Sequence, residues 1–208
     1  MLSSGDTLQH IVFIQKEDSM TEEAMGHVCP PKHVKWLNNP LRKLIQNPKK
    51  IMGEYVSHGD TVIDLGCGGG YFSVALAKMV GETGRVIAMD LQKEMLDFTR
   101  DFAAKKGVLD RITLHQCQEK DIGLTDVKVD FALAFYMVHE VPDRLRFLRQ
   151  VADLLKPDAH FMLIEPKHHV SGEQFNQILS EVNSVDLEMI KPIKLFFSRG
   201  MLLRLANK

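Results

Sequence analysis

Cysteine is scarce in this sequence. Only three cysteines occur among 208 residues, and Cys29, Cys67 and Cys117 are too widely spaced to form a Cys-x-x-Cys pair. An odd number of scattered cysteines is not the pattern of a disulfide framework, which is typical of small extracellular proteins. We therefore expect the protein to reside in a reducing compartment, the cytoplasm.

A long hydrophobic run is missing as well. The longest uninterrupted apolar stretch is Phe131–Val138, which is far shorter than the roughly 20 residues that cross a bilayer. Another apolar stretch near the N-terminus, Ile11–Ile14, is too short for the hydrophobic region of a secretory signal, and charged residues follow it. The sequence therefore predicts neither a membrane span nor a signal peptide.

The sequence has no excess of charge of either sign. It contains 26 Lys and Arg against 27 Asp and Glu, a formal net charge of −1. Dedicated nucleic-acid-binding proteins usually carry a large positive excess, so we expect no nucleic-acid partner. Apolar residues make up 45% of the chain, which allows a chain of this length to bury a core without metals or disulfides.

From Thr61 onward, apolar segments alternate with amphipathic ones. The apolar segments predict strands at residues 61–65, 85–90, 112–117, 130–135, 160–165, 185–194 and 195–205. The amphipathic segments predict helices at residues 71–80, 92–106 and 143–156 and a further helix that opens with a capping box of Ser171 and Gln174. This alternation favours a parallel sheet covered by helices on both faces, with a ligand beyond the carboxyl ends of the strands.

The first part of the chain stands apart from this alternation. Residues 1–34 are polar and irregular. Asn39-Pro40 and Asn47-Pro48 each predict a helix start, because Asn suits the N-cap and Pro suits the first helical position. We therefore divide the chain into an N-terminal extension, residues 1–46, and a domain, residues 47–208.

A glycine-rich turn follows the first predicted strand. Gly66, Gly68 and Gly70 form a Gly-x-Gly-x-Gly pattern just before the predicted helix. Glycine lets a ligand approach the backbone closely, and the helix N-terminus beyond it suits an anionic group such as a carboxylate. A dinucleotide-binding fingerprint needs a glycine at the position of Tyr71, which argues against a nicotinamide-dependent oxidoreductase.

Acidic residues end the first two predicted strands. Asp64 lies just before the glycine turn, and Asp90 closes the second strand. A carboxylate at Asp90 can accept hydrogen bonds from both vicinal hydroxyls of a ribose. The alternative is that Asp90 only caps the helix that begins near Gln92. The combination with the glycine turn favours the ribose.

On these residues the sequence resembles the class I S-adenosylmethionine-dependent methyltransferases. It has their motif I at Asp64–Gly70, the acidic residue Asp90, and a segment similar to their motif IV at Val129–Phe135. Leu154–Phe161 is similar to their Leu-Leu-Lys-Pro-Gly-Gly turn, although Asp158-Ala159 replaces the two glycines. The resemblance is nearest to the small-molecule branch that includes the ubiquinone/menaquinone C-methyltransferases. It implies an α/β Rossmann-like three-layer sandwich with a seven-stranded, mostly parallel sheet whose last strand is antiparallel.

The resemblance also implies which residues bind the cofactor. The turn would pass under the methionine part of S-adenosylmethionine, Asp90 would hold the ribose, and Leu91 would pack on the adenine. Asp64 would orient the turn and the amino group of the cofactor, and Gln118 lies where the family often contacts the adenine amino group. The complete cofactor-binding set expected is Asp64, Gly66, Cys67, Gly68, Gly70, Asp90, Leu91, Gln118 and Phe135.

Candidate catalytic residues follow the fourth predicted strand. His139 is a candidate general base with Glu140 as its orienting carboxylate, and Tyr136 is the third candidate. The alternative is that His139 packs under the cofactor while Glu140 binds a backbone group. After the fifth predicted strand, Glu165 or His168 is expected to line the acceptor pocket.

The sequence therefore predicts an enzyme that transfers a methyl group from S-adenosylmethionine to a small-molecule acceptor, with S-adenosylhomocysteine as the product. A non-catalytic sensor or assembly protein that binds the same cofactor remains the alternative, because it would keep the same turn and acidic residue.

In many relatives an N-terminal extension closes over the site as a lid. We expect a monomer or homodimer, and no metal site, since His27, Cys29 and His33 lack a fourth ligand.

Overall fold

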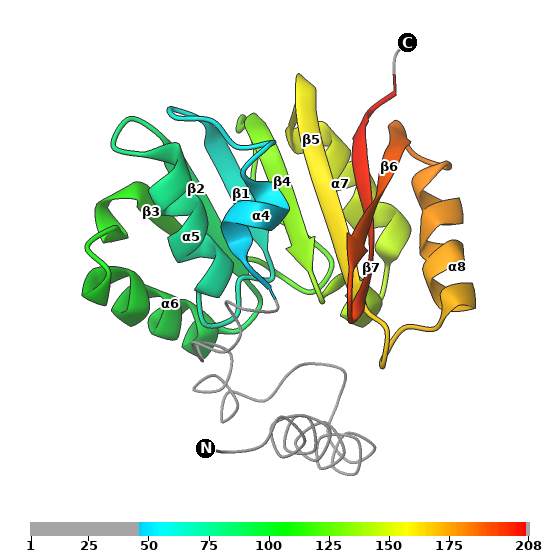
Figure 1. Ribbon diagram of the computed structural model, residues 1–208, viewed down its shortest axis with the longest axis horizontal. Helices are drawn as coiled ribbons and strands as arrows, with labels where there is room; N and C mark the ends of the chain where they lie inside the picture. The colour runs from blue at the N-terminus through cyan, green and yellow to red at the C-terminus, as the bar shows by residue number, and fades with distance from the viewer. Residues whose placement is uncertain (1–45, 207–208) are drawn as a thin grey trace, which may run out of the picture. The chain divides into compact units, whose positions relative to one another are not determined.

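The computed structural model describes residues 46–206 (Figure 1). The helix start expected at Asn39-Pro40 and almost all of the expected N-terminal extension lie outside the described residues. None of the helices within residues 46–206 combines the length and the apolarity that a membrane crossing requires.

A seven-stranded sheet forms the centre of the described chain, in the order β3-β2-β1-β4-β5-β7-β6. The strands are β1 (Thr61–Leu65), β2 (Arg85–Asp90), β3 (Ile112–Gln116), β4 (Val129–Phe135), β5 (Leu155–Pro166), β6 (Leu187–Leu195) and β7 (Ser198–Leu205). The first five strands pair in parallel, and β7 pairs antiparallel with both β5 and β6. The prediction of an α/β fold with a mostly parallel sheet and an antiparallel last strand is confirmed.

Helices cover both faces of this sheet (Figure 1). They are α4 (Pro48–Met52), α5 (Tyr71–Val80), α6 (Lys93–Lys105), α7 (Arg144–Leu154) and α8 (Gly172–Val182), with short 3-10 helices η3 (Leu109–Arg111) and η4 (Val138–Glu140). Val62 in β1 belongs to a core that includes residues of α4, α5 and α6, whereas its neighbour Ile63 belongs to a second core that includes residues of α7 and α8. Successive side chains of a strand point to opposite faces, so the nearly continuous apolar strands build two cores, one on each side.

Helix starts follow the chemistry read from the sequence. The Asn47 side chain accepts a hydrogen bond from the Lys50 backbone N–H, with proline in the first turn of α4. Ser171 and Gln174 form the predicted capping box at the start of α8. Both confirm that polar side chains satisfy the first backbone N–H groups of these helices.

The boundary between α7 and β5 differs from the prediction. The helix was expected to reach residue 156 and the strand to begin at residue 160, but α7 ends at Leu154 and β5 begins at Leu155. Lys156 precedes a proline, and the residue before proline disfavours helical backbone. The Lys156 ammonium then binds the Asp130 carboxylate at 2.7 Å across the sheet, which holds this segment in the strand.

Candidate active site

The glycine-rich turn between β1 and α5 has a backbone that requires glycine. Gly66 and Gly70 have φ angles of 69° and 79°, in the left-handed region that other residues rarely adopt. A Cβ on Gly70 would lie 2.8 Å from Thr99 Oγ1, and one on Gly66 would lie 3.0 Å from Met137 Cβ. At both positions, conformation and close packing therefore exclude a side chain.

Two side chains outside the predicted set of site residues hold this turn. Thr99 of α6 donates a hydrogen bond to the Gly68 carbonyl at 2.8 Å. Ser73 of α5 donates to Asp64 Oδ2 at 2.5 Å, and both hydroxyl residues are fully buried. The sequence did hold a signal for both residues, because Ser73 and Thr99 are small polar residues among the apolar residues of a predicted helix. Asp64 thus connects β1 to the first turns of α5.

The Asp90 carboxylate joins the end of β2 to the glycine turn. Its Oδ2 accepts a hydrogen bond from the Gly68 N–H at 2.9 Å, and its Oδ1 accepts one from the Gln92 N–H at 3.0 Å. Burial raises the pKa of Asp90, although hydrogen bonds from the backbone of Gln92, Gly68 and Leu91 oppose the shift. The hydrogen bond from Gln92 agrees with the alternative that Asp90 caps the start of α6. The hydrogen bond from Gly68 places the same carboxylate at the glycine turn.

The other expected cofactor residues lie at the carboxyl ends of neighbouring strands. Leu91, next to Asp90, is one of the large apolar residues that remain exposed, at 36%. Gln118 is exposed in the loop that follows β3. Phe135 at the end of β4 is buried, and its ring centre lies 4.3 Å from that of Phe72 and 4.4 Å from that of Tyr136.

Cys67 contributes to the turn through its backbone. Its N–H donates to the Met89 carbonyl at 2.8 Å, which ties the turn to β2. Burial raises the pKa of the Cys67 thiol well above its usual value, and the nearby Asp64 and Asp90 carboxylates raise it further. A protonated, buried thiol is a poor nucleophile or metal ligand at neutral pH.

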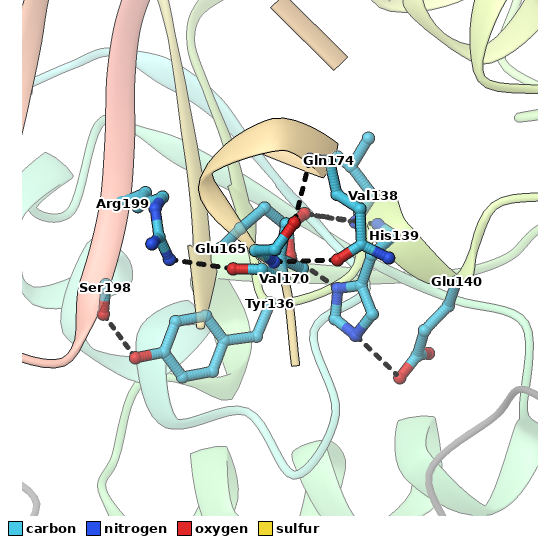
Figure 2. Close-up of polar contacts among 10 residues, drawn as sticks. Tyr136, Val138, His139, Glu140, Glu165, Val170, Gln174, Ser198 and Arg199 are labelled. Atoms are coloured by element: carbon cyan, nitrogen blue, oxygen red, sulfur yellow. Dashed lines mark hydrogen bonds and ion pairs between the residues drawn. The ribbon is translucent and has the colours of Figure 1, made fainter. Parts of the chain in front are cut away.

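Tyr136 follows β4 in a strained conformation. Its φ angle is 65°, which is uncommon for a residue with a bulky side chain. Its N–H donates to the Ile164 carbonyl at 2.8 Å, and the Gln46 side-chain amide donates to its hydroxyl at 3.0 Å. The hydroxyl also hydrogen-bonds Ser198 of β7 (Figure 2). These contacts hold the segment after β4 against β5 and β7.

His139 makes its closest polar contact with Glu165, at the end of β5 (Figure 2). The imidazole Nδ1 lies 2.5 Å from Glu165 Oε2, and the backbone N–H groups of Val138 and His139 lie 2.9 Å and 3.3 Å from Glu165 Oε1. The Glu165 side chain is completely buried, whereas 23% of the His139 side chain is exposed.

Glu165, and not Glu140, is therefore the carboxylate that orients His139. A Glu140 oxygen lies 4.0 Å from the other imidazole nitrogen, Nε2, beyond hydrogen-bond length. Glu140 was the expected partner because it is adjacent to His139 in the chain. The parallel pairing of β4 with β5, which sets Phe135 beside Ile164, brings in Glu165 from 26 positions away.

The loop after β5 packs beside this pair. The His169 ring stacks on the His139 ring with centroids 6.0 Å apart, and His168 packs on His169 at 4.4 Å. Arg199 of β7 donates to the Val170 carbonyl at 2.8 Å and fixes the end of the loop (Figure 2). His168 is thus placed near the candidate catalytic segment through His169.

Both groups of side chains lie at the same edge of the sheet. The glycine turn follows β1, Tyr136 and His139 follow β4, and these two strands are neighbours. The strand order changes direction between β1 and β4, and ligands of open α/β sheets bind at such a point. A turn with four glycines, a carboxylate on the adjacent strand and the exposed Leu91 fit an amino acid joined to a nucleoside.

Comparison with known proteins agrees with this geometry. A family model described as "Methyltransferase domain" matches residues 56–194. The solved structure of a SAM dependent methyltransferase from Aquifex aeolicus superposes with a TM-score of 0.78 and 26% sequence identity, over 86% of this chain and 100% of that chain.

Two curated relatives have named reactions. A demethylmenaquinone methyltransferase of Lactobacillus johnsonii is 32% identical over 136 residues, which cover 64% of this chain and 56% of the relative. A 2-phytyl-1,4-naphtoquinone methyltransferase of Synechococcus elongatus is 33% identical over 122 residues, which cover 58% of this chain and 52% of the relative. The chain spans about half the length of these curated relatives.

Proposed function

The chain belongs to the class I S-adenosylmethionine-dependent methyltransferases, and we propose on this basis that it transfers the methyl group of S-adenosylmethionine to a small-molecule acceptor. The observation that carries the proposal is the Asp90 carboxylate, 2.9 Å from the Gly68 N–H of the glycine turn. Family membership points to the cofactor, and this contact points to where the cofactor binds.

We assign the cofactor contacts as follows. The turn from Gly66 to Gly70 contacts the methionine part, and Asp64 orients the turn. Asp90 accepts hydrogen bonds from the ribose hydroxyls, and the exposed Leu91 packs on the adenine. Cys67, Gln118 and Phe135 complete the site. When bound, S-adenosylmethionine supplies an activated methyl group on a positively charged sulfur.

The acceptor that we propose is a small aromatic molecule. Relatives of this chain are named for methylating a demethylmenaquinone and a phytyl naphthoquinone. Tyr136, which is partly exposed and packs on the buried Phe135, supplies an aromatic ring beside the candidate catalytic segment. Aromatic side chains offer large apolar area to a planar ring, which supports an aromatic acceptor.

His139 is the general base that we propose, with Tyr136 and Glu140 beside the acceptor. Holding the acceptor and the methyl carbon in line supplies roughly 7–11 kcal/mol of the barrier reduction. A base adds about 10²–10⁴-fold when the acceptor loses a proton. Glu140, 4.0 Å from His139 Nε2, is close enough to interact with a proton that arrives there.

We further propose that residues 1–46 act as a lid on a domain of residues 47–208. Support comes from Gln46, whose carbonyl accepts a hydrogen bond from the Tyr71 hydroxyl at 2.9 Å and whose amide donates to Tyr136. The chain thus enters the domain beside the candidate site. Limited proteolysis of the full chain tests this: S-adenosylhomocysteine should protect sites before residue 46, and equal cleavage would contradict it.

We also place the protein in the cytoplasm, as a monomer or homodimer without a nucleic-acid partner. The described cysteines, Cys67 and Cys117, are both free thiols, which supports a reducing compartment. The balanced charge of the chain supports a small-molecule partner rather than a nucleic acid.

Two measurements test the proposed function. Calorimetry with S-adenosylmethionine and S-adenosylhomocysteine measures cofactor binding. Incubation with S-adenosylmethionine that carries a trideuterated methyl group, and with hydroquinones, naphthols, amines and thiols, measures transfer by mass spectrometry. Binding with transfer is the expected result. Binding without transfer to any acceptor would favour the non-catalytic alternative, and absence of binding would reject both.

A further inference from the structure

Glu165 has the least exposed carboxylate among residues 46–206, with no accessible surface. Its two oxygens have different partners. Oε1 accepts from the backbone N–H groups of Val138 and His139, and Oε2 lies 2.5 Å from His139 Nδ1. A buried carboxylate is retained only where it is paired and hydrogen-bonded, and here both residues that hydrogen-bond it, Val138 and His139, belong to one short segment after β4.

We propose that Glu165 is a positioning residue that keeps the proton of neutral His139 on Nδ1, so that Nε2 is the base that accepts a proton from the methyl acceptor. This inference rests on the proposed function. It restricts the acceptor to molecules whose nucleophilic atom must lose a proton, such as a phenol, a hydroquinone or a ring carbon beside an ionised hydroxyl.

The tautomer that we assign to His139 follows from its hydrogen-bond partner. A carboxylate accepts hydrogen bonds and donates none, so we assign Nδ1 as the donor in the contact with Oε2. The two backbone N–H groups on Oε1 prevent the carboxylate from rotating, which keeps Oε2 directed at Nδ1 (Figure 2). In a neutral imidazole one ring nitrogen carries the proton and the other accepts. Nε2 therefore carries the lone pair.

The surroundings of His139 support a base that faces outward. The imidazole is 23% exposed while Glu165 is buried beneath it. The charged and titratable groups around the pair are Glu140, 4.0 Å from Nε2, His169, stacked at 6.0 Å, and Arg144, which interacts electrostatically with Glu165. Two carboxylates beside the ring stabilise the imidazolium that forms when Nε2 takes a proton.

The step balances without a further reactant. A bond forms between the acceptor atom and the methyl carbon, the bond from that carbon to sulfur breaks, and its electron pair stays on sulfur. The acceptor proton moves to His139 Nε2, and Glu165 stabilises the resulting positive charge. The proton later leaves to solvent through the exposed side of the ring. An acceptor with no dissociable proton, such as a thioether, would gain nothing from this pair.

A Glu165→Gln variant separates two roles of Glu165: orienting the His139 imidazole, and accepting hydrogen bonds from the backbone of Val138 and His139. The Gln oxygen can keep the two backbone N–H groups, but the amide NH₂ then faces Nδ1. Nδ1 must become an acceptor, which moves the imidazole proton to Nε2 and removes the lone pair that the reaction needs. In the serine-protease triad, the corresponding change from carboxylate to amide leaves geometry intact and removes activity through the wrong tautomer.

The experiment combines NMR with kinetics on the full chain. Nitrogen-15-labelled histidine reports the tautomer of His139, assigned by comparison with His139→Asn. We expect an Nδ1–H tautomer in the wild type and an Nε2–H tautomer in Glu165→Gln, whose kcat falls about 10²–10⁴-fold while its affinity for S-adenosylhomocysteine is unchanged. Glu165→Asp keeps a carboxylate and should keep the Nδ1–H tautomer and part of the turnover.

Glu188→Gln is the matched control, because it makes the same chemical change in a carboxylate of β6 that accepts a hydrogen bond from Arg204 of β7 at 2.5 Å. It should change neither the tautomer nor kcat. An Nε2–H tautomer in the wild type overturns the inference, and so does wild-type kcat in Glu165→Gln. The tautomer of the wild type needs neither cofactor nor acceptor, so it still tests Glu165 if no methyl transfer is found, a result that would count against the proposed function instead.

Discussion

Asp90 Oδ2 lies 2.9 Å from the Gly68 backbone nitrogen, so the end of β2 and the glycine turn form one hydrogen-bonded unit. The carboxylate that we assign to the ribose is thus held in place by the same backbone that we assign to the methionine part. A cofactor that binds both parts would meet groups that are already positioned relative to each other, which lowers the entropic cost of binding.

This unit predicts that cofactor affinity falls in mildly acidic solution. Burial raises the pKa of Asp90, so its carboxyl becomes protonated at a higher pH than an ordinary Asp, and the protonated form accepts fewer hydrogen bonds. Calorimetry at a series of pH values, from neutral down through the raised pKa of Asp90, should show weaker binding of S-adenosylmethionine at the acidic end. Asp90→Asn should bind weakly at every pH in this range. Equal pH dependence in the variant and the wild type would refute the assignment.

The same shift has a defined sign for folding stability. A raised pKa in the folded state means that ionised Asp90 destabilises the fold relative to the protonated form. The stabilisation that protonated Asp90 gives the fold is fully present at pH values below the pKa that Asp90 has in the unfolded chain. It is lost as the pH rises through the higher pKa that Asp90 has in the folded protein. Ligand that binds the ionised carboxylate should therefore raise the melting temperature more at neutral pH than at acidic pH, as differential scanning fluorimetry can measure.

Gly70→Ala should destabilise the fold more than an alanine at another left-handed glycine. Both Gly70 (φ 79°) and Gly107 (φ 66°) lie in that region, but a Cβ on Gly107 would meet nothing within 4 Å, whereas one on Gly70 meets Thr99. Gly107→Ala should lose roughly 1–2 kcal/mol of unfolding free energy, and Gly70→Ala about 1–3 kcal/mol more through overpacking. Urea unfolding measures both, and equal losses would contradict the role of Thr99.

Tyr136 and Ser198 should be energetically coupled. Their hydroxyls hydrogen-bond each other between the segment after β4 and the start of β7, and Ser198 is 4% exposed. Tyr136→Phe and Ser198→Ala should each lower the unfolding free energy, with a coupling of about 0.5–1.5 kcal/mol in the double mutant. Additive losses would show that the bond does not form in solution. Because Tyr136 is also a proposed site residue, its variant should lower kcat, and the Ser198 variant should lower kcat less.

The two described cysteines should resist alkylation in the folded protein. Burial raises the pKa of Cys117 to about 11, with the Asp90 carboxylate adding to the shift, and Cys67 is raised in the same direction. The thiolate is the reactive form, so iodoacetamide at neutral pH should modify neither residue until the chain is denatured. Mass spectrometry of the peptides measures this. Rapid modification of Cys117, which is only partly buried, would argue against the raised pKa of its thiol.

Local patterns were sufficient to predict the elements around the glycine turn. The predicted bounds of β1, α5 and β2 agree with those observed, because each apolar run is limited by turn residues that the chain cannot incorporate into a strand or helix. The capping box of α8 was readable for the same reason, since its hydrogen bonds join residues three positions apart. The predicted boundary between α7 and β5 was wrong because Leu154 and Leu155, on either side of the true boundary, are both apolar.

By itself, the sequence determined the layered fold, the position of the glycine turn and the acidic residue, Asp90, that ends β2. Apolar periodicity, glycine spacing and an acid at the end of a strand are all properties of neighbouring residues. Only the tertiary structure decided that Glu165 rather than Glu140 meets His139, and that Thr99 closes over Gly68. These contacts join residues 26 and 31 positions apart. They depend on the register between β4 and β5 and on the packing of α6, which the whole core fixes together and which no local pattern encodes.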